Sequence, residues 1–98
     1  MIVMRNTYVP RPGHADDLMD MIREGHAILD YTPHFRILTP IAGPSGTVVH
    51  EIEYEDFAAR DKFVGDLRSS EEWPVFMERW YQLVESGGSA EFWLVRQA

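Results

Sequence analysis

The segment Thr47–Leu67, TVVHEIEYEDFAARDKFVGDL, contains the change of hydrophobic period that decides the fold. Its first half alternates with a period of two, which predicts a strand with two different faces. One face carries Val48, His50, Ile52 and Tyr54, and the other carries Val49, Glu51 and Glu53. At Asp56, a favourable helix N-cap residue, the period becomes helical, with Ala59, Phe63 and Leu67 on one stripe. A strand therefore leads directly into a helix, which must fold back over one face of a sheet.

The rest of the chain supplies three more strands and further helical segments. Alternating segments predict strands over residues 1–9, 35–41 and 89–97, in addition to 47–54. Apolar stripes predict helices over 14–30 and 56–68, and a third helical segment that begins at Ser69 or at Pro74 and stops at Gly87-Gly88. The tight connection Gly43–Gly46 makes the second and third strands antiparallel neighbours.

This order, βαββαβ with the second helix in two pieces, predicts an α+β fold of the ferredoxin-like type. Such a fold has a four-stranded antiparallel sheet with its helices on one face. We expect residues 1–98 to form one domain, because the chain shows no internal linker or low-complexity segment.

The composition excludes several classes of function. The net charge is −7, with 16 acidic and 9 basic residues, so we expect neither nucleic acid nor an anionic membrane as a partner. The sequence has no cysteine, which excludes a disulfide framework, a thiolate nucleophile and a cysteine-ligated zinc site. The apolar start is too short for a signal peptide or a membrane span, so we expect a cytoplasmic protein.

Alternation divides the predicted strand residues between two faces of the sheet. The face under the helices is predicted to carry Ile2, Met4, Asn6, Tyr8, Ile37, Thr39, Ile41, Val48, His50, Ile52, Tyr54, Trp93 and Val95. The opposite face would carry Val3, Arg5, Thr7, Val9, Arg36, Leu38, Val49, Glu51, Glu53, Phe92, Leu94 and Arg96. This second face is too apolar for water, so we predict a homodimer that closes sheet against sheet. Arg5, Arg36 and Arg96 would neutralise Glu51 and Glu53 there.

The pattern resembles the dimeric α/β barrel superfamily, and within it the NIPSNAP-like and antibiotic-biosynthesis-monooxygenase-like families. The segments that carry the resemblance are Arg5–Tyr8, Arg11–Gly13, Glu51–Asp56 and Leu67–Ser70 leading into Trp73. The resemblance implies a homodimer with a cavity between sheet and helices in each subunit. Some members of the superfamily oxidise polycyclic aromatic compounds without metal or flavin, and others open haem.

The haem-degrading branch can be compared residue by residue. Asn6 stands the same distance before Gly13 as the catalytic asparagine of that branch stands before its own glycine. The branch also has a tryptophan and a haem-ligating histidine, and these positions fall near Asp66 and Met77 in this sequence. Since the histidine ligand is missing, we expect no haem chemistry of that type, and no cofactor is predicted.

His50 is the main candidate for a functional residue, because it lies mid-strand on the predicted cavity face with Asn6, Tyr8 and Tyr54. A histidine there can act as a general base near neutral pH or hold an acidic phenolic ligand. The alternative is a buried neutral histidine that a tyrosine hydroxyl satisfies. Asn6 and Tyr8 would orient a ligand, or the Asn6 amide would be bonded to backbone.

Aromatic residues and the other titratable groups allow two interpretations each. Trp73, Phe76, Trp80 and Trp93 would form walls for a planar ligand, or they are simply core. The glutamates Glu51, Glu53 and Glu55 fit a salt-linked interface better than an acid/base pair. His14, His26 and His34 lack metal-ligand spacing, and His26 is predicted to form a surface pair with Asp30.

Three functions remain in order of preference. The lack of a complete catalytic set favours a non-catalytic module that binds a small aromatic or polyketide-like ligand. The alternative is a cofactor-independent monooxygenase or isomerase that uses His50 as its base. Haem binding is the third.

Overall fold

The computed structural model describes residues 1–97, and its elements follow one another as β-α-β-β-α-α-β. The strands are β1 (Ile2–Pro10), β2 (Phe35–Leu38), β3 (Val48–Tyr54) and β4 (Val84–Leu94). The helices are α1 (Ala15–His26), α2 (Phe57–Arg68) and α3 (Trp73–Tyr81). All strand pairs are antiparallel, and the strand order is β2-β3-β1-β4. The ferredoxin-like α+β fold is confirmed.

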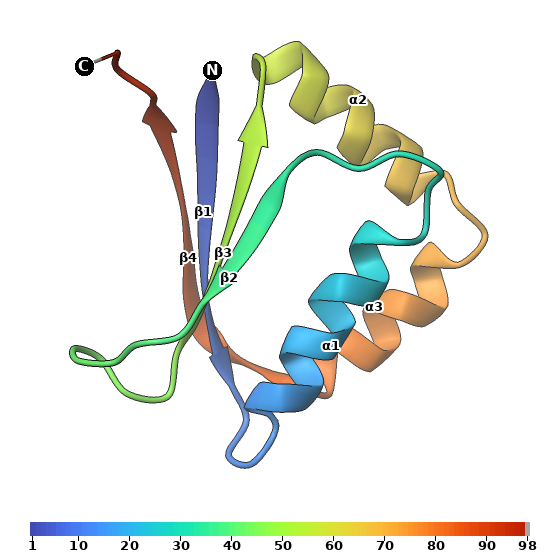
Figure 1. Ribbon diagram of the computed structural model, residues 1–98. Coiled ribbons are helices and arrows are strands. Elements are labelled where there is room, and N and C mark those ends of the chain that lie inside the picture. The colour runs from blue at the N-terminus through green and yellow to red at the C-terminus, as the bar shows by residue number, and fades with distance from the viewer. Residues whose placement is uncertain (98) are drawn as a thin grey trace.

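All three helices lie on the same side of the sheet, and the opposite sheet face is bare (Figure 1). Two clusters of buried apolar side chains fill the space between the layers. One contains Ile2, Ile52, Tyr54, Phe63 and Leu67, and the other contains Leu18, Ile22 and Val48. Within residues 1–97, no helix has the length and apolar character needed to cross a bilayer.

The start of α2 follows the prediction from local sequence. The Asp56 side chain accepts a hydrogen bond of 2.8 Å from the backbone N–H of Ala59, which satisfies a donor that the first helical turn leaves free. The ends of two other elements were predicted too far along the chain. Helix α1 ends at His26 rather than Asp30, and β2 ends at Leu38, which leaves Ile41 fully exposed in the following loop.

Strand β4 differs most from the prediction. It begins at Val84 rather than Ser89, so Gly87-Gly88 lies inside a strand and does not stop a helix. A Cβ atom on Gly88 would lie 2.7 Å from the backbone oxygen of Thr7, so this close approach of β4 to β1 needs a glycine. The pairing of β1 with β4 also shifts register between Thr7 and Val9.

The predicted faces are correct for β1, β2 and β3 and inverted for β4. In the observed register Met4 is opposite Phe92, and Val3 is opposite Trp93. Residues opposite each other share a face, so Phe92 lies on the helix side, where its ring meets that of Phe57. Trp93 lies on the bare face under the Arg5 guanidinium, at 5.5 Å from the ring centroid. The predicted placement of Trp93 on the helix side is wrong.

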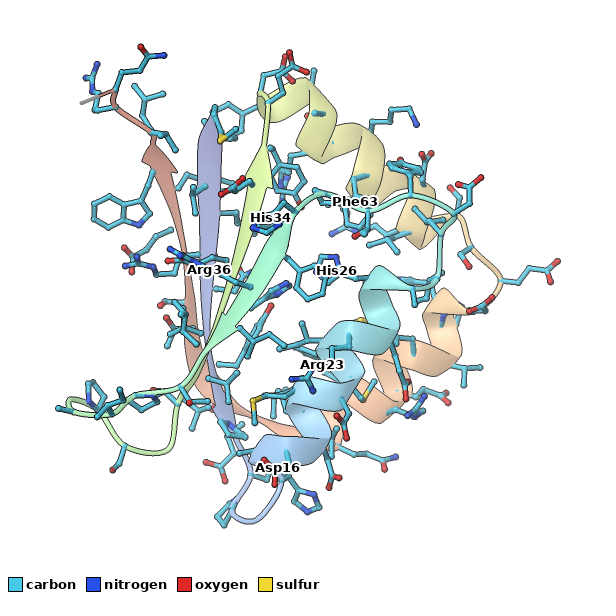
Figure 2. All side chains as sticks on the ribbon, viewed as in Figure 1. Asp16, Arg23, His26, His34, Arg36 and Phe63 are labelled. Atoms are coloured by element: carbon cyan, nitrogen blue, oxygen red, sulfur yellow. The ribbon has the colours of Figure 1, made fainter. Side chains whose placement is uncertain are left out.

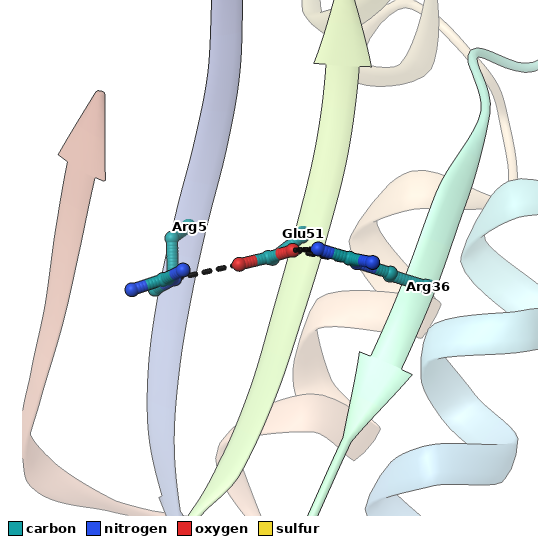
Figure 3. Close-up of polar contacts among 3 residues, drawn as sticks. All are labelled: Arg5, Arg36 and Glu51. Atoms are coloured by element: carbon teal, nitrogen blue, oxygen red, sulfur yellow. Dashed lines mark hydrogen bonds and ion pairs between the residues drawn. The ribbon is translucent and has the colours of Figure 1, made fainter. Parts of the chain in front are cut away.

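The bare face holds a buried carboxylate between two arginines from the neighbouring strands (Figure 3). Glu51 Oε2 accepts from Arg5 Nε at 2.7 Å, and Glu51 Oε1 accepts from Arg36 Nε at 2.6 Å. The side chains of Arg5 and Arg36 are 40% and 66% exposed, whereas that of Glu51 is 4% exposed. Two of the three predicted arginines therefore pair with Glu51 within one chain.

Candidate functional site

A cavity of about 240 Å³ lies between the sheet and the helices. Six of the seven residues predicted for a ligand site line it, namely Asn6, Tyr8, His50, Tyr54, Trp73 and Trp80. The seventh, Trp93, is on the opposite side of the sheet, as the β4 register requires. The other lining residues are mostly apolar, and they include Phe63, Phe76 and Met77.

His26 and His50 form a buried pair at the wall of this cavity. The Nε2 atoms of the two rings are 2.8 Å apart, and the ring planes are nearly perpendicular. His26 also stacks flat on Phe35, with 3.7 Å between ring centroids. Figure 2 shows His26 and Phe63 in the space between the helices and the sheet. One hydrogen bond therefore joins the two histidines, and the partner of His50 is His26 rather than the tyrosine hydroxyl that the buried-histidine alternative predicted.

The prediction of a surface pair between His26 and Asp30 is wrong, because His26 is only 8% exposed and Asp30 lies beyond the end of α1. A signal for its burial is present in the sequence. His26 continues the helical stripe of Leu18 and Ile22 at intervals of four residues, and both of those residues are buried.

The pair continues into a hydrogen-bonded chain that reaches the surface. His26 Nδ1 lies 2.6 Å from the hydroxyl oxygen of Thr32, an exposed residue that also donates to the Pro33 carbonyl at 3.4 Å. At the inner end of the chain, His50 Nδ1 is buried without a hydrogen-bond partner among the described residues. An unpartnered buried nitrogen of this kind is unusual in a folded protein and often marks a site for a water molecule or a ligand.

Burial keeps the titratable groups of the cavity uncharged. It lowers the pKa of His26 to about 4. It lowers the pKa of His50 to about 3, with a further lowering from the neighbouring His26. Burial raises the pKa of Tyr8 and that of Tyr54 to about 12. At neutral pH all four groups are therefore uncharged.

These pKa values limit the chemistry that His50 can perform. A base with a pKa of about 3 that takes a proton from a phenol of pKa about 10 works against a gap of roughly 7 units, or about 10 kcal/mol. A general base near neutral pH would need a pKa close to 7. His50 is thus better suited to hydrogen bonding than to proton abstraction.

The aromatic wall of the cavity comes mainly from α3. Trp73, Phe76 and Trp80 follow one another with ring centroids 5.6 and 6.1 Å apart. Trp80 also meets Tyr8 edge to face at 4.9 Å. Gly25 lets α3 come close to α1, since a Cβ atom there would lie 3.0 Å from the Phe76 ring. The result is a flat, apolar wall opposite the polar groups of β1 and β3.

The residues present do not fit a haem of the type that the resemblance raised. Met77, near which the resemblance places the ligating histidine of that branch, lines the cavity but offers no imidazole, and the two cavity histidines bind each other. Asp66 is occupied at the surface by Lys62 and Tyr31. Within residues 1–97, no group of three or more His, Asp or Glu side chains is arranged to hold a metal ion.

No protein-family model and no curated protein matches the sequence. Among solved structures, an uncharacterized NIPSNAP domain protein from Burkholderia xenovorans superposes with a TM-score of 0.82 at 23% identity, over 100% of this chain and 96% of that one. A NIPSNAP family protein from Agrobacterium tumefaciens gives 0.79 at 23% identity, over 97% and 85%.

A mutant of SnoaB, a cofactor-independent oxygenase from Streptomyces nogalater, gives a TM-score of 0.72 at 11% identity, over 99% of this chain and 94% of that one. The chain therefore shares its fold, a four-stranded antiparallel sheet with helices on one face, with these NIPSNAP proteins and with an antibiotic biosynthesis monooxygenase, as the resemblance predicted. At these identities the comparison establishes the fold and not the activity.

Proposed function

We propose that the cavity binds a small uncharged aromatic compound and that the protein is a non-catalytic binding module. The observation that carries this proposal is the lining itself, which combines an aromatic wall with polar groups that are all neutral at pH 7. A charged ligand would lose its hydration without gaining an opposite charge, so the cavity selects against it. A planar apolar ligand would bury most of its surface.

The volume limits the size of this ligand. An engineered cavity of roughly 150 Å³ holds benzene, and sites for drug-sized ligands start at roughly 300 Å³. The present 240 Å³ lies between these values. It suits a compound of one or two fused rings better than the larger polyketide-like ligand that the sequence also suggested.

A pair of matched variants tests the proposal. Val64 lines the cavity, whereas Val75 is an exposed residue of α3 outside it. Titration of 2-naphthol by calorimetry should show binding to the wild type and to Val75→Phe. The affinity of Val64→Phe should be at least about tenfold lower, because the phenylalanine ring fills part of the cavity. Equal binding to both variants, or no binding to the wild type, would contradict the proposal.

We further propose a homodimer that closes through the bare sheet face. The sheet has helices on one side only, and the bare face carries Val3, Leu38, Val49 and the Trp93 ring. A stable interface of standard size buries roughly 800 Å² per chain, and a second copy on this face would cover its apolar side chains. Leu38→Glu should halve the mass measured by light scattering, while Val75→Glu on the helix side should not change it.

A cofactor-independent oxygenase is the second candidate, favoured by the fold shared with SnoaB and by Asn6 in the cavity lining opposite the aromatic wall. It requires His50 to act as base. His50→Ala would then abolish oxygen uptake with an activated phenolic substrate and leave substrate binding in place. The low pKa of His50 is the reason for placing this candidate second.

A further inference from the structure

The chain His50–His26–Thr32 has a property that goes beyond a fixed hydrogen-bond partner. Each neutral imidazole carries one proton, and only one proton lies between the two Nε2 atoms. The Thr32 hydroxyl can accept from His26 Nδ1 or donate to it across their 2.6 Å contact. Two arrangements of protons therefore satisfy the same heavy-atom positions.

In the first arrangement each hydrogen bond of this series is donated toward the surface. His50 Nε2–H donates to His26 Nε2, and His26 Nδ1–H donates to Thr32, whose hydroxyl donates to the Pro33 carbonyl. His50 Nδ1 then carries no proton and is a hydrogen-bond acceptor. In the second arrangement Thr32 donates to His26 Nδ1, His26 Nε2–H donates to His50, and His50 Nδ1–H is a donor.

We propose that the hydrogen-bonded residues His50, His26 and Thr32 form a reversible hydrogen-bond switch. The cavity then binds aromatic ligands whose single polar group is either a donor, such as a phenol, or an acceptor, such as an aryl ketone. The inference rests on the proposed function and specifies its ligand class. It is carried by the unpartnered His50 Nδ1, the nitrogen directed away from His26 on a residue that lines the cavity. Neighbouring atoms cover Nδ1, so a ligand reaches it by displacing them.

The exchange between the two arrangements conserves protons and charge. One proton passes from His50 Nε2 to His26 Nε2, and the His26 Nδ1 proton passes to Thr32. Thr32 releases its own hydroxyl proton to water. His50 takes one at Nδ1 from a water molecule that reaches this nitrogen when the atoms covering it move aside. Each histidine keeps one proton throughout, and the cavity stays neutral. Thr32 is exposed, which gives the outer end of the chain its contact with solvent.

The test compares three probes of similar shape: 2-naphthol as donor, 1-tetralone as acceptor and naphthalene as neither. For the wild type at pH 8 we expect 2-naphthol and 1-tetralone each to bind roughly three- to tenfold more tightly than naphthalene, which is the range for one net hydrogen bond. The ¹⁵N chemical shift of His50 Nδ1 should be that of a protonated nitrogen with 1-tetralone and of an unprotonated one with 2-naphthol.

Two variants of Thr32 separate the switch from a fixed contact. Thr32→Asp offers His26 only an acceptor, which holds the first arrangement, so 2-naphthol keeps its advantage and 1-tetralone loses it. Thr32→Asn, whose amide can donate or accept, keeps both advantages. The exposed position of Thr32 makes both changes compatible with folding, and the ¹⁵N measurement on the wild type does not depend on either variant.

The outcomes are distinct. Equal affinity for all three probes overturns the switch but leaves the proposed function standing. An advantage for only one of the two polar probes, or a His50 Nδ1 shift that is the same with both, also overturns it. If no probe binds the wild type, the proposed function fails and the switch fails with it.

Discussion

The two faces of the sheet bury polar groups in opposite ways, and consecutive residues of β3 show the difference. His50 on the covered face is 7% exposed, and Glu51 on the bare face is 3% exposed. Burial lowers the pKa of His50 and leaves it neutral beside His26. Burial alone would raise the pKa of Glu51, but hydrogen bonds from Arg5 and Arg36 outweigh it and hold that pKa below its ordinary value. Burial thus keeps His50 neutral, whereas the two arginines keep the equally buried Glu51 charged.

This difference assigns different roles to the two faces. A neutral covered face can receive an uncharged ligand without separating an ion pair. The bare face holds its charge between two half-exposed arginines, where a charged cluster can fix the register of a partner surface at modest energetic cost. Experiments that titrate, remove or screen charge should therefore affect the two faces unequally.

Acid should produce the largest effect, and it acts on the covered face. The folded-state pKa values of His26 and His50, about 4 and about 3, lie below their ordinary value of 6.5. As pH falls below about 6.5, the unfolded chain takes up protons before the folded chain does. The contribution of the two histidines to stability is complete above that pH and declines down to about pH 4 for His26 and about pH 3 for His50. Between pH 8 and pH 5 we expect the free energy of unfolding to fall by about 4 kcal/mol for the two groups together.

Urea denaturation at a series of pH values measures this decline. The double variant His26→Phe with His50→Leu should lose most of it, whereas His34→Gln, a change at an exposed histidine, should keep it. A wild-type stability that stays constant between pH 8 and pH 5 would mean that the pair is not buried in its neutral form.

Removal of the charge on the bare face should have a smaller effect. Glu51→Gln keeps the shape but replaces a buried carboxylate with an amide between two guanidinium groups, so we expect a loss of about 2 kcal/mol at pH 7. The half-exposed arginines recover part of their hydration, which keeps this value below the cost of a fully buried unpaired charge. Glu53→Gln, two residues along the same face, should change stability by less than about 0.5 kcal/mol. Equal losses for the two variants would rule out a special role for Glu51.

The contrast between the faces could be predicted from sequence only where it depends on local pattern. Alternation in β3 places His50 and Glu51 on opposite faces, and the change of period at Asp56 locates the start of α2. Both signals lie within a few residues. Strand β4 has no such signal, because Ser-Gly-Gly-Ser gives no alternation and its register depends on pairing with β1 across a shift. Trp93 was therefore assigned to the wrong face.

The site was predicted as single residues and missed as a pair. Position 26 could be recognised as buried from the stripe of Leu18 and Ile22, but its partner His50 is 24 residues away, on another element. Nothing in local sequence gives the angle at which α1 ends over β3. The cavity volume depends likewise on how closely α1 and α3 approach at Gly25, which only the assembled fold determines.

Salt should produce the smallest effect, and it acts on the bare face alone. Raising the ionic strength from 0.1 M to 1 M shortens the screening length from about 10 Å to about 3 Å. The destabilisation caused by Glu51→Gln should then shrink by about 0.5 kcal/mol, since Arg5 and Arg36 are in contact with solvent. The destabilisation caused by the double histidine variant at pH 8 should not change, because no charge is lost there.

A second copy that covers the bare face would keep salt away from Glu51, so the salt response should be larger in the Leu38→Glu background than in the wild type. A response of the same size in both backgrounds would mean that this face stays open to solvent.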